Sequence, residues 1–159
     1  MDLRTSIESN ARSDLQPVVD RLECVRRLEV EILELPQVDL STENLVHGGM
    51  CARTILIPAG TVLTGAQTNM DNVCIVCGDI EVTTDEGVQR ITGYHVLPAK
   101  AGEKRAGVAH ADTWWTTIWP TALTDIDAIE DEATSESHLL QTRRGALGFE
   151  RMNELEGKN

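Results

Sequence analysis

Aromatic side chains are scarce in this chain of 159 residues, where tryptophan, tyrosine and phenylalanine together make up 3% of the sequence. A hydrophobic core must therefore rest on valine, isoleucine, leucine and alanine, and the length suits a single domain with a helix or two beside it. No apolar run approaches the ~20 residues that a membrane-spanning helix needs, and the first residues form no signal-peptide core. We therefore expect no membrane association and a cytoplasmic location.

Basic residues are also few, because 14 lysines and arginines stand against 26 aspartates and glutamates, for a formal net charge of -12. Such a chain repels phosphates, so sequence-independent binding to DNA or RNA is excluded. Acidic residues concentrate between Asp125 and Glu136. That cluster either keeps the protein in solution or docks on a basic partner.

Cysteine is limited to four residues, of which only Cys74 and Cys77 lie close together in the sequence. On a strand, residues three apart point to opposite faces, so these two thiols would not converge on a metal ion. Cys24 and Cys51 lie too far apart to supply the second pair of a zinc ribbon. We expect buried, reduced cysteines. The chain also lacks a phosphate-binding loop, a nucleophile elbow, a zinc-protease helix motif and a dinucleotide fingerprint.

A helix is predicted near the N-terminus, capped by Ser13 or Asp14 and ended by Pro36 at the latest. Residues 28–33 also alternate as a strand would, so both interpretations stay open there, with a helix to about Leu33 favoured. The apolar residues that recur at helical spacing are Leu15, Val18, Val19, Leu22, Val25, Leu28 and Ile32.

A second helix is predicted after Pro120, where Thr124 can cap the segment Asp125–Ala133. Acidic residues in its first turn suit the helix dipole. Beyond Ser135 we expect either another short helix or disorder. Three apolar residues of the capped segment would share the face that packs on the rest of the chain: Ile126, Ile129 and Ala133.

Between these helices the sequence breaks into short β-like runs separated by turn residues, with Asp85-Glu86-Gly87 as a good hairpin signal. Several short strands at regular spacing are typical of an all-β sandwich or barrel. The predicted strands are Met50–Ile57, Val62–Gly65, Asn72–Val76, Asp79–Thr83, Val88–Thr92, Tyr94–Leu97, Arg105–Ala109 and Thr113–Trp119.

A family resemblance is carried by five segments, which are Leu35-Pro36-Gln37-Val38-Asp39, His47-Gly48-Gly49-Met50-Cys51-Ala52-Arg53, the run Ile57–Gly65, Gly78-Asp79-Ile80 and Thr116-Thr117-Ile118-Trp119-Pro120-Thr121. In this order they are similar to segments of the small cupin-like proteins encoded by tailed phages and prophages. The resemblance implies a mainly β fold, a cupin-like double-stranded β-helix or jelly-roll barrel, with an N-terminal helix and a C-terminal acidic helix. It divides the chain into a helical arm (1–35), a barrel (36–121) and an acidic tail (122–159).

The metal-binding histidines of that family are degenerate in this chain. The first cupin motif, threaded from Gly60 to Gly78, places its histidines on Ala66 and Thr68 and its acid near Asp71 or Asn72, while the phage-type pattern expects histidines at Thr68 and Asn72. The histidine of the second motif falls on Arg105. A guanidinium cannot lose its proton at ordinary pH, so Arg105 cannot ligate a cation. The resemblance therefore implies that the inherited metal site is absent and that no cofactor is held.

A rebuilt metal site is an alternative, and it would use His95 and His110 with Asp71 or Asp112 as the third ligand. Histidines in such places more often hydrogen-bond a loop or lie half exposed. This alternative leads to a metal-dependent cupin enzyme.

Arg105 points to two further possibilities, because an arginine inside a small barrel needs a carboxylate partner or a bound anion. If both side chains face inward, Asp71 is the expected partner in a structural salt bridge. Otherwise the barrel holds a pocket for an anionic or sugar-like ligand. The residues expected to line that pocket are Thr68, Asp71, Asn72, Tyr94, Arg105 and His110.

Trp114, Trp115 and Trp119 lie in one predicted strand. Because Trp114 and Trp115 are adjacent, one faces inward and the other outward. The outward tryptophan is covered either by a terminal helix or by another subunit, since tryptophan often dominates subunit contacts. The three tryptophans are therefore the candidate interface residues.

Taken together, these features predict a non-enzymatic, phage-derived protein that acts as an oligomeric structural or accessory module, in the virion or in the host cytoplasm. Its expected partners are further copies of itself and other virion proteins. The first alternative is a protein that binds or sequesters a small anionic or sugar-like ligand in a metal-free barrel. The second alternative is the metal-dependent enzyme.

Overall fold

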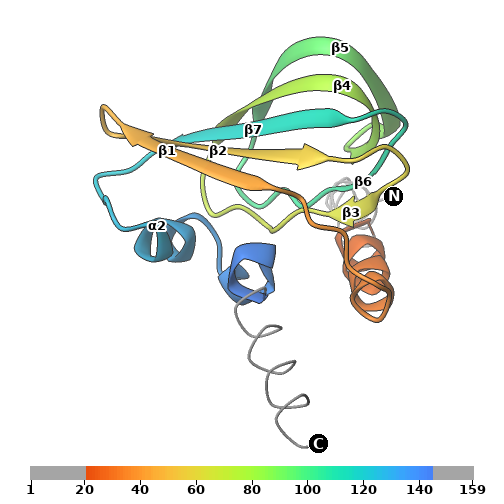
Figure 1. Cartoon of the computed structure of the whole chain (residues 1–159), viewed down its shortest axis with the longest axis horizontal. Helices are drawn as coiled ribbons and strands as arrows, with labels where there is room; N and C mark the ends of the chain where they lie inside the picture. The colour runs from red at the N-terminus through yellow and green to blue at the C-terminus, as the bar shows by residue number, and fades with distance from the viewer. Residues whose placement is uncertain (1–20, 145–159) are drawn as a thin grey trace, which may run out of the picture.

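The computed structural model describes residues 21–144, and its centre is an antiparallel sheet that curls on itself (Figure 1). The sheet order is β1-β2-β7-β4-β6-β3, and β5 pairs with the other edge of β4. The expected mainly β fold class is confirmed. The strands are β1 (Thr42–His47), β2 (Met50–Ile57), β3 (Val62–Thr64), β4 (Asn72–Thr84), β5 (Gly87–Ala99), β6 (Ala106–Ala109) and β7 (Thr113–Pro120).

The β4–β5 hairpin is the longest pairing of the sheet, and it closes at the predicted turn after Thr84. The other edge of β4 pairs with β7 over residues 73–77 and then with β6 over residues 80–82. Gly78 lies at this switch with φ 152°, a backbone conformation that favours glycine. The bend there lets one strand serve both halves of the curled sheet.

Two strand breaks expected from the sequence, at Gly78 and at Gly93, are wrong. The two glycines lie opposite each other inside the β4–β5 ladder, so each strand continues through its glycine. Glycine inside a strand marks a bend or a close approach of backbone as often as an end. Strand β1 was not predicted, whereas β2 has the predicted bounds Met50–Ile57.

Helices cover one side of the sheet (Figure 1). The first described helix continues to residue 33, which confirms the expected helix end, while the predicted caps Ser13 and Asp14 lie outside the described residues. Helix α2 (Ile126–Ala133) is capped by Asp125, one residue later than predicted, because the Asp125 carboxylate accepts a hydrogen bond from the Ala128 N–H at 3.0 Å. The short helix η1 (Ser137–Leu139) follows.

The core forms two clusters of side chains. The first lies between the strands and contains Ile57, Val76, Ile80, Val82 and Ala109. The second joins β2 and β7 to α2 through Cys51, Trp119 and Ile129, with Ile126 and Ala133 packed against it. The prediction that one apolar face of α2 packs on the barrel is therefore confirmed.

None of the helices among residues 21–144 is both long enough and apolar enough to cross a bilayer. The division into an arm, a barrel and a tail stays a prediction, although the helices contact the sheet closely, as the contacts below show.

Candidate functional site

A cavity of about 270 Å³ lies inside the barrel, between the inner face of the sheet and the helices that cover it. Members of both core clusters line it, so it separates the strand cluster from the helix cluster. Most of its wall is aliphatic or aromatic. The apolar lining includes Leu40, Ile55, Ile57, Leu63, Met70, Ile80, Val82, Trp115, Trp119, Ala133, Leu139 and Leu140.

The inner row of β7 forms one wall of the cavity. Trp115, Thr117 and Trp119 alternate with outward residues, as the period of a strand requires. Arg53 of β2 and Cys74 of β4 pair with Thr117 from either side. Trp119 is only 5% exposed, and among the described residues its indole Nε1–H has no hydrogen-bond partner.

Arg105 lies at the cavity wall just before β6, with its guanidinium 6.0 Å from the ring centroid of Trp115. Its carboxylate partner is Glu103, at 2.6 Å, rather than the expected Asp71. The Asp71 side chain is exposed and accepts a hydrogen bond from the Ala101 N–H at 2.9 Å. Asp71 precedes the inward-facing Asn72 by one residue, and neighbouring residues of an extended chain point to opposite sides.

The other expected pocket residues divide into two groups. Thr68 and Asn72 line the cavity, and the Asn72 amide donates to the Met70 carbonyl at 3.2 Å. Tyr94 is 66% exposed on β5, and His110 is exposed after β6, so neither lines the cavity. The His110 ring instead contacts Glu81 at 2.7 Å on the outer side of the sheet.

The residues that the sequence resemblance assigns to metal positions do not fit a metal ion. Thr68, Asn72 and Arg105 offer a hydroxyl, an amide and a permanently protonated guanidinium, whereas such sites need several imidazole or carboxylate ligands. His95 donates from Nε2 to the Thr92 carbonyl at 2.9 Å and lies on the exposed strand β5. Across residues 21–144, no three His, Cys, Asp or Glu side chains come together as a potential metal site.

The cysteines divide between inside and outside. Cys51 and Cys74 are buried, while Cys24 and Cys77 are exposed, so the expectation of buried thiols is wrong for these two. Burial raises the pKa of the Cys74 thiol above its ordinary value, although the nearby Arg105 guanidinium opposes this effect. Burial likewise raises the pKa of the Cys51 thiol. Both buried thiols therefore stay protonated and weakly nucleophilic at neutral pH.

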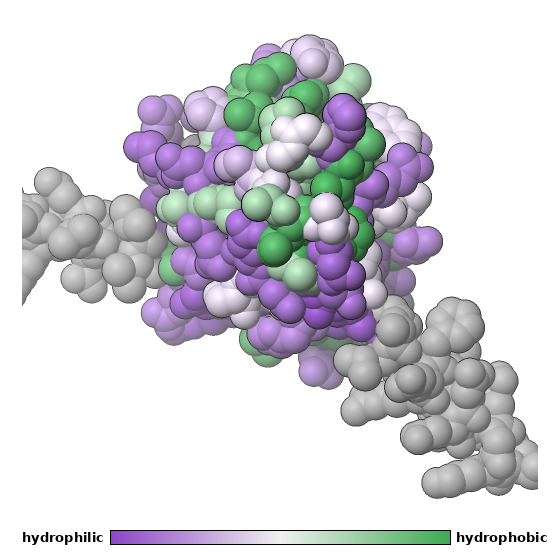
Figure 2. Space-filling model, turned by 90° about the vertical axis from the view of Figure 1, so that its left-hand side faces the viewer, coloured by the Kyte–Doolittle hydropathy of each residue, from purple (hydrophilic) through white to green (hydrophobic). Residues whose placement is uncertain are grey.

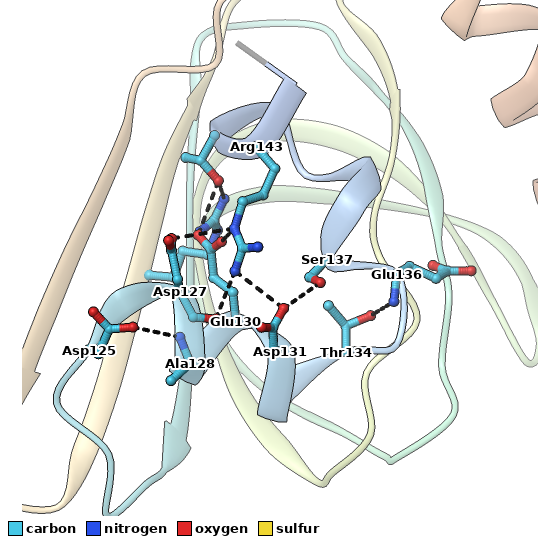
Figure 3. A network of polar contacts seen from close by, with 11 residues as sticks. Asp125, Asp127, Ala128, Glu130, Asp131, Thr134, Glu136, Ser137 and Arg143 are labelled. Atoms are coloured by element: carbon cyan, nitrogen blue, oxygen red, sulfur yellow. Dashed lines mark hydrogen bonds and ion pairs between the residues drawn. The ribbon is translucent and has the colours of Figure 1, made fainter. Parts of the chain in front are cut away.

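A buried carboxylate fastens the helices that close the cavity (Figure 3). Glu130 of α2 is 4% exposed in its side chain, and it accepts from Arg53 of β2 at 2.7 Å and from Arg143 at 2.8 Å. Arg143 also reaches Asp131 at 3.2 Å. Two guanidiniums thus compensate one buried carboxylate and link the sheet, α2 and the segment after η1.

A second buried ion cluster fastens the N-terminal helix. The Lys104 side chain is fully buried, and its Nζ donates to Glu29, Glu136 and the Gly65 carbonyl, each at 2.8 Å. Burial alone would raise the pKa of the Glu136 carboxyl, but hydrogen bonds from the Gln67 N–H and from Lys104 lower it below its ordinary value. Three acceptors from three segments therefore meet on one ammonium group.

The outer face of the sheet carries a second candidate site, which we call the outer apolar face. Cys77 of β4 pairs with Tyr94 of β5 on one side and Trp114 of β7 on the other, and all three are exposed. Trp114 is 47% exposed. The face extends along the same strands and onto β2, and its members are Ala52, Thr54, Leu56, Val73, Ile75, Cys77, Tyr94, Val96, Pro98, Trp114, Thr116 and Ile118.

The members of the outer apolar face carry no charge, and the charge at its edge is the exposed Glu43 of β1, which pairs with Thr54; the rest of the outer side is more highly charged. Beyond the bend at Gly78, the outward residues form an ion pair between Asp79 and Arg90 at 2.7 Å, followed by the contact of Glu81 with His110. Figure 2 shows how hydrophobic side chains gather on the upper part of one side of the molecule, above a mostly hydrophilic lower part. Contiguous apolar patches of this kind mark interaction surfaces.

Sequence reasoning predicted that one of Trp114 and Trp115 faces outward, which the structure shows to be Trp114, but it missed several residues that shape the cavity. Arg53 and Glu130 were not singled out, because their pairing joins residues 77 positions apart and leaves no local pattern. Trp119 was expected at an interface with Trp114 and Trp115, whereas the structure places Trp115 and Trp119 at the cavity wall. Only Trp114 of the three belongs to the outer apolar face.

Comparison with known proteins gives distant similarities only. No family model and no curated protein matches the sequence. Among solved structures, a cupin superfamily protein from Desulfitobacterium hafniense has 14% identity and a TM-score of 0.45, covering 55% of this chain and 83% of its own. KdgF from a Halomonas species has 15% identity and a TM-score of 0.46, covering 57% and 87%.

A cupin-2 domain of an XRE family transcriptional regulator from Enterobacter cloacae has 11% identity and a TM-score of 0.43, covering 52% of this chain and 99% of its own. The structures to which this chain is similar are thus cupins. At these scores they carry no inference about activity, and the fold assignment rests on the strand order and pairing described above.

Proposed function

We propose that this chain is a non-enzymatic barrel that works as a homo-oligomeric structural or accessory module, with a phage origin as its sequence resemblance implies. The observation that carries the proposal is the uncharged outer apolar face centred on Trp114, Cys77 and Tyr94. A non-catalytic role is supported by the hydroxyl, amide and guanidinium at the cupin metal positions and by the raised pKa values of the buried thiols.

The charge of the chain favours a second copy as the occupant of this face. A formal net charge of -12 makes two copies repel each other over most of their surfaces. A face without charges is where that repulsion is weakest and where apolar burial can exceed it. A basic partner would instead gain most from the acidic helix α2, which lies away from this face.

The residue types on the face also suit a self-complementary contact. Two-fold dimers use the same patch on both subunits, so a flat patch with large central side chains can pair with itself. Trp114 and Tyr94 are the side chains that most often dominate the energy of such contacts. Thr54 and Thr116 already satisfy each other by a hydrogen bond at 2.7 Å, so burying this pair costs little.

The test is the subunit count of the purified protein and of Trp114→Glu, measured by native mass spectrometry and by light scattering after size exclusion. We expect a discrete oligomer for the natural chain and a folded monomer for Trp114→Glu, because a carboxylate would be buried against its own copy. Val88→Glu is the control for the added charge, since Val88 is also apolar and exposed, at 68%, but lies beyond the bend of β4.

Two results would overturn this proposal. The first is that the natural chain is a monomer at every concentration measured. The second is that Val88→Glu dissociates the oligomer as fully as Trp114→Glu. Circular dichroism of each variant establishes that the barrel is intact, so a loss of fold is not mistaken for dissociation.

A further inference from the structure

The volume of the cavity limits the size of the ligand that it can hold. An engineered apolar cavity of about 150 Å³ accommodates benzene, so by proportion about 270 Å³ accommodates about ten non-hydrogen atoms. Protein cores are normally packed without voids much larger than a water molecule. A space of this size in a small barrel is therefore an unusual feature and has the character of a binding site.

The shape of the cavity follows the inner row of β7. Trp115 and Trp119 are four residues apart on the strand, which corresponds to roughly 13 Å at the rise of a β-strand. Thr117 lies between them, so this wall of the cavity carries two indoles along one strand with a small side chain between them. An elongated apolar molecule fits this arrangement better than a compact one.

The charged group that distinguishes the cavity is Arg105. Glu103 occupies its Nη2 at 2.6 Å, and within the described part of the chain its Nε and Nη1 donate no hydrogen bond. The face of Trp115 lies beside the guanidinium, which leaves the donor edge to an incoming acceptor. Each parallel donor pair of an arginine includes Nη2, so an incoming carboxylate would use the Nη1–H together with the second N–H of Nη2, which Glu103 leaves available.

Arg144 also lies at the wall, where it donates to the Leu139 carbonyl and to Gln37 and forms no ion pair within residues 21–144, while the carboxylates at the wall are compensated. Glu130 is paired with Arg53, and Glu29 is paired with Lys104. The interior therefore offers a partly free guanidinium without an unpaired carboxylate to compete for it. The unpaired Nε1–H of Trp119 adds a donor at the other end, where a buried unsatisfied group costs about 1–3 kcal/mol.

We propose that the cavity binds a small organic monocarboxylate with an elongated apolar body of about ten non-hydrogen atoms, its carboxylate on Arg105 and its body along Trp115 and Thr117. The inference is independent of oligomerisation, because the cavity and the outer apolar face lie on opposite sides of the sheet. Sugar-like ligands are disfavoured, since the mostly apolar wall offers few partners for their hydroxyls.

The test uses octanoate, which has ten non-hydrogen atoms, and 1-octanol, which has the same chain without the charge. Binding is followed by isothermal titration calorimetry below the micellar concentration, with intrinsic tryptophan fluorescence as a second readout. We expect octanoate to bind in a one-to-one ratio and at least tenfold more tightly than 1-octanol. Arg105→Gln should weaken octanoate at least tenfold and leave 1-octanol unchanged.

Two variants make the test specific to the cavity. Arg90→Gln removes an arginine of the outer sheet surface, and octanoate should bind this variant as it binds the natural chain. Ala133→Met fills the cavity from α2 without changing charge, and it should weaken both ligands, whereas binding to the outer apolar face would be unaffected.

The proposal is overturned if octanoate does not bind, if it binds no better than 1-octanol, or if Arg105→Gln leaves its affinity unchanged. Octanoate binding that persists in Ala133→Met would place the ligand elsewhere and would also overturn it. None of these outcomes depends on the subunit count, so failure here is distinguishable from failure of the proposed oligomer.

Discussion

At the scale of single residues, the curl of the barrel depends on a close approach at Gly78. A Cβ at this position would lie 2.7 Å from the Cα of Thr113 and 2.8 Å from the Asp112 carbonyl oxygen. The Thr113 side chain is fully buried and accepts a hydrogen bond from the Asp79 N–H at 3.1 Å. The missing side chain therefore makes room for the start of β7.

Gly78→Ala should consequently reduce the free energy of unfolding by about 2–3 kcal/mol, through overpacking against backbone that cannot move. Gly93→Ala is the matched control, because Gly93 lies opposite in the same ladder, also has a positive φ, and has open space around its missing Cβ. The control should lose only about 1 kcal/mol from backbone strain. Urea denaturation of both variants is the measurement, and equal losses would contradict the role assigned to Thr113.

Which individual residues face the cavity was only partly predictable. Thr68, Asn72 and Arg105 follow from threading a family motif, because the motif encodes which strand positions point inward. Tyr94 and Asp71 fail for one physical reason, since a shift of a single residue turns a side chain to the other face of a strand. The register of β5 against β4 settles that shift, and no local signal in the sequence does so.

At the scale of the elements, buried ion pairs connect the helices to the barrel in addition to the apolar contacts of α2. Lys104 joins the first described helix, through Glu29, to the segment after α2, through Glu136. Removing one partner of a buried pair commonly costs 3–5 kcal/mol, because the other charge is left buried. This cluster should therefore respond strongly to protonation.

The lowered pKa of Glu136 gives the pH dependence a definite sign. The fold binds the ionised form preferentially, so the stability gained from Glu136 is complete above the ordinary carboxyl pKa and is lost as the pH falls through the lowered value. We expect Glu136→Gln to be less stable than the natural chain at pH 7, and the gap to shrink below about pH 4. Urea denaturation at a series of pH values measures this gap.

Glu34→Gln controls for the loss of one negative charge, because Glu34 is exposed and forms no ion pair within residues 21–144. A gap for Glu136→Gln that stays constant from neutral to acid pH would contradict the account of the Lys104 cluster. A similar gap for Glu34→Gln would attribute the effect to net charge instead.

The bounds of the helices and strands were more predictable than the long-range contacts between them. Periodicity gave the end of the first helix, the apolar face of α2 and the bounds of β2, because these depend on neighbours in the sequence. The continuity of β4 and β5 through their glycines, and the clusters around Glu130 and Lys104, depend on residues far apart in the chain. Such long-range pairings leave no periodic trace.

At the scale of the whole molecule, the sheet separates two candidate activities. Its inner face carries a cavity with a partly free guanidinium, and its outer face is apolar over β2, β7 and the parts of β4 and β5 before the bend at Gly78, with Glu43 of β1 at the edge. The proposal of a homo-oligomeric module rests on the outer face, and the proposal of a carboxylate ligand rests on the inner one. The central claim is that a second copy of the chain buries the outer apolar face, because the acidic remainder of the chain makes this weakly charged face distinctive.

The most direct measurement of that claim is alkylation of the natural chain by iodoacetamide, followed residue by residue with peptide mass spectrometry. Cys77 lies within the outer apolar face and Cys24 lies on the exposed surface of the first described helix, so the chain contains its own control. The account predicts rapid labelling of Cys24 at every protein concentration and protection of Cys77 that increases with concentration and disappears in Trp114→Glu. Equal labelling of Cys77 and Cys24 at the highest concentration would contradict it.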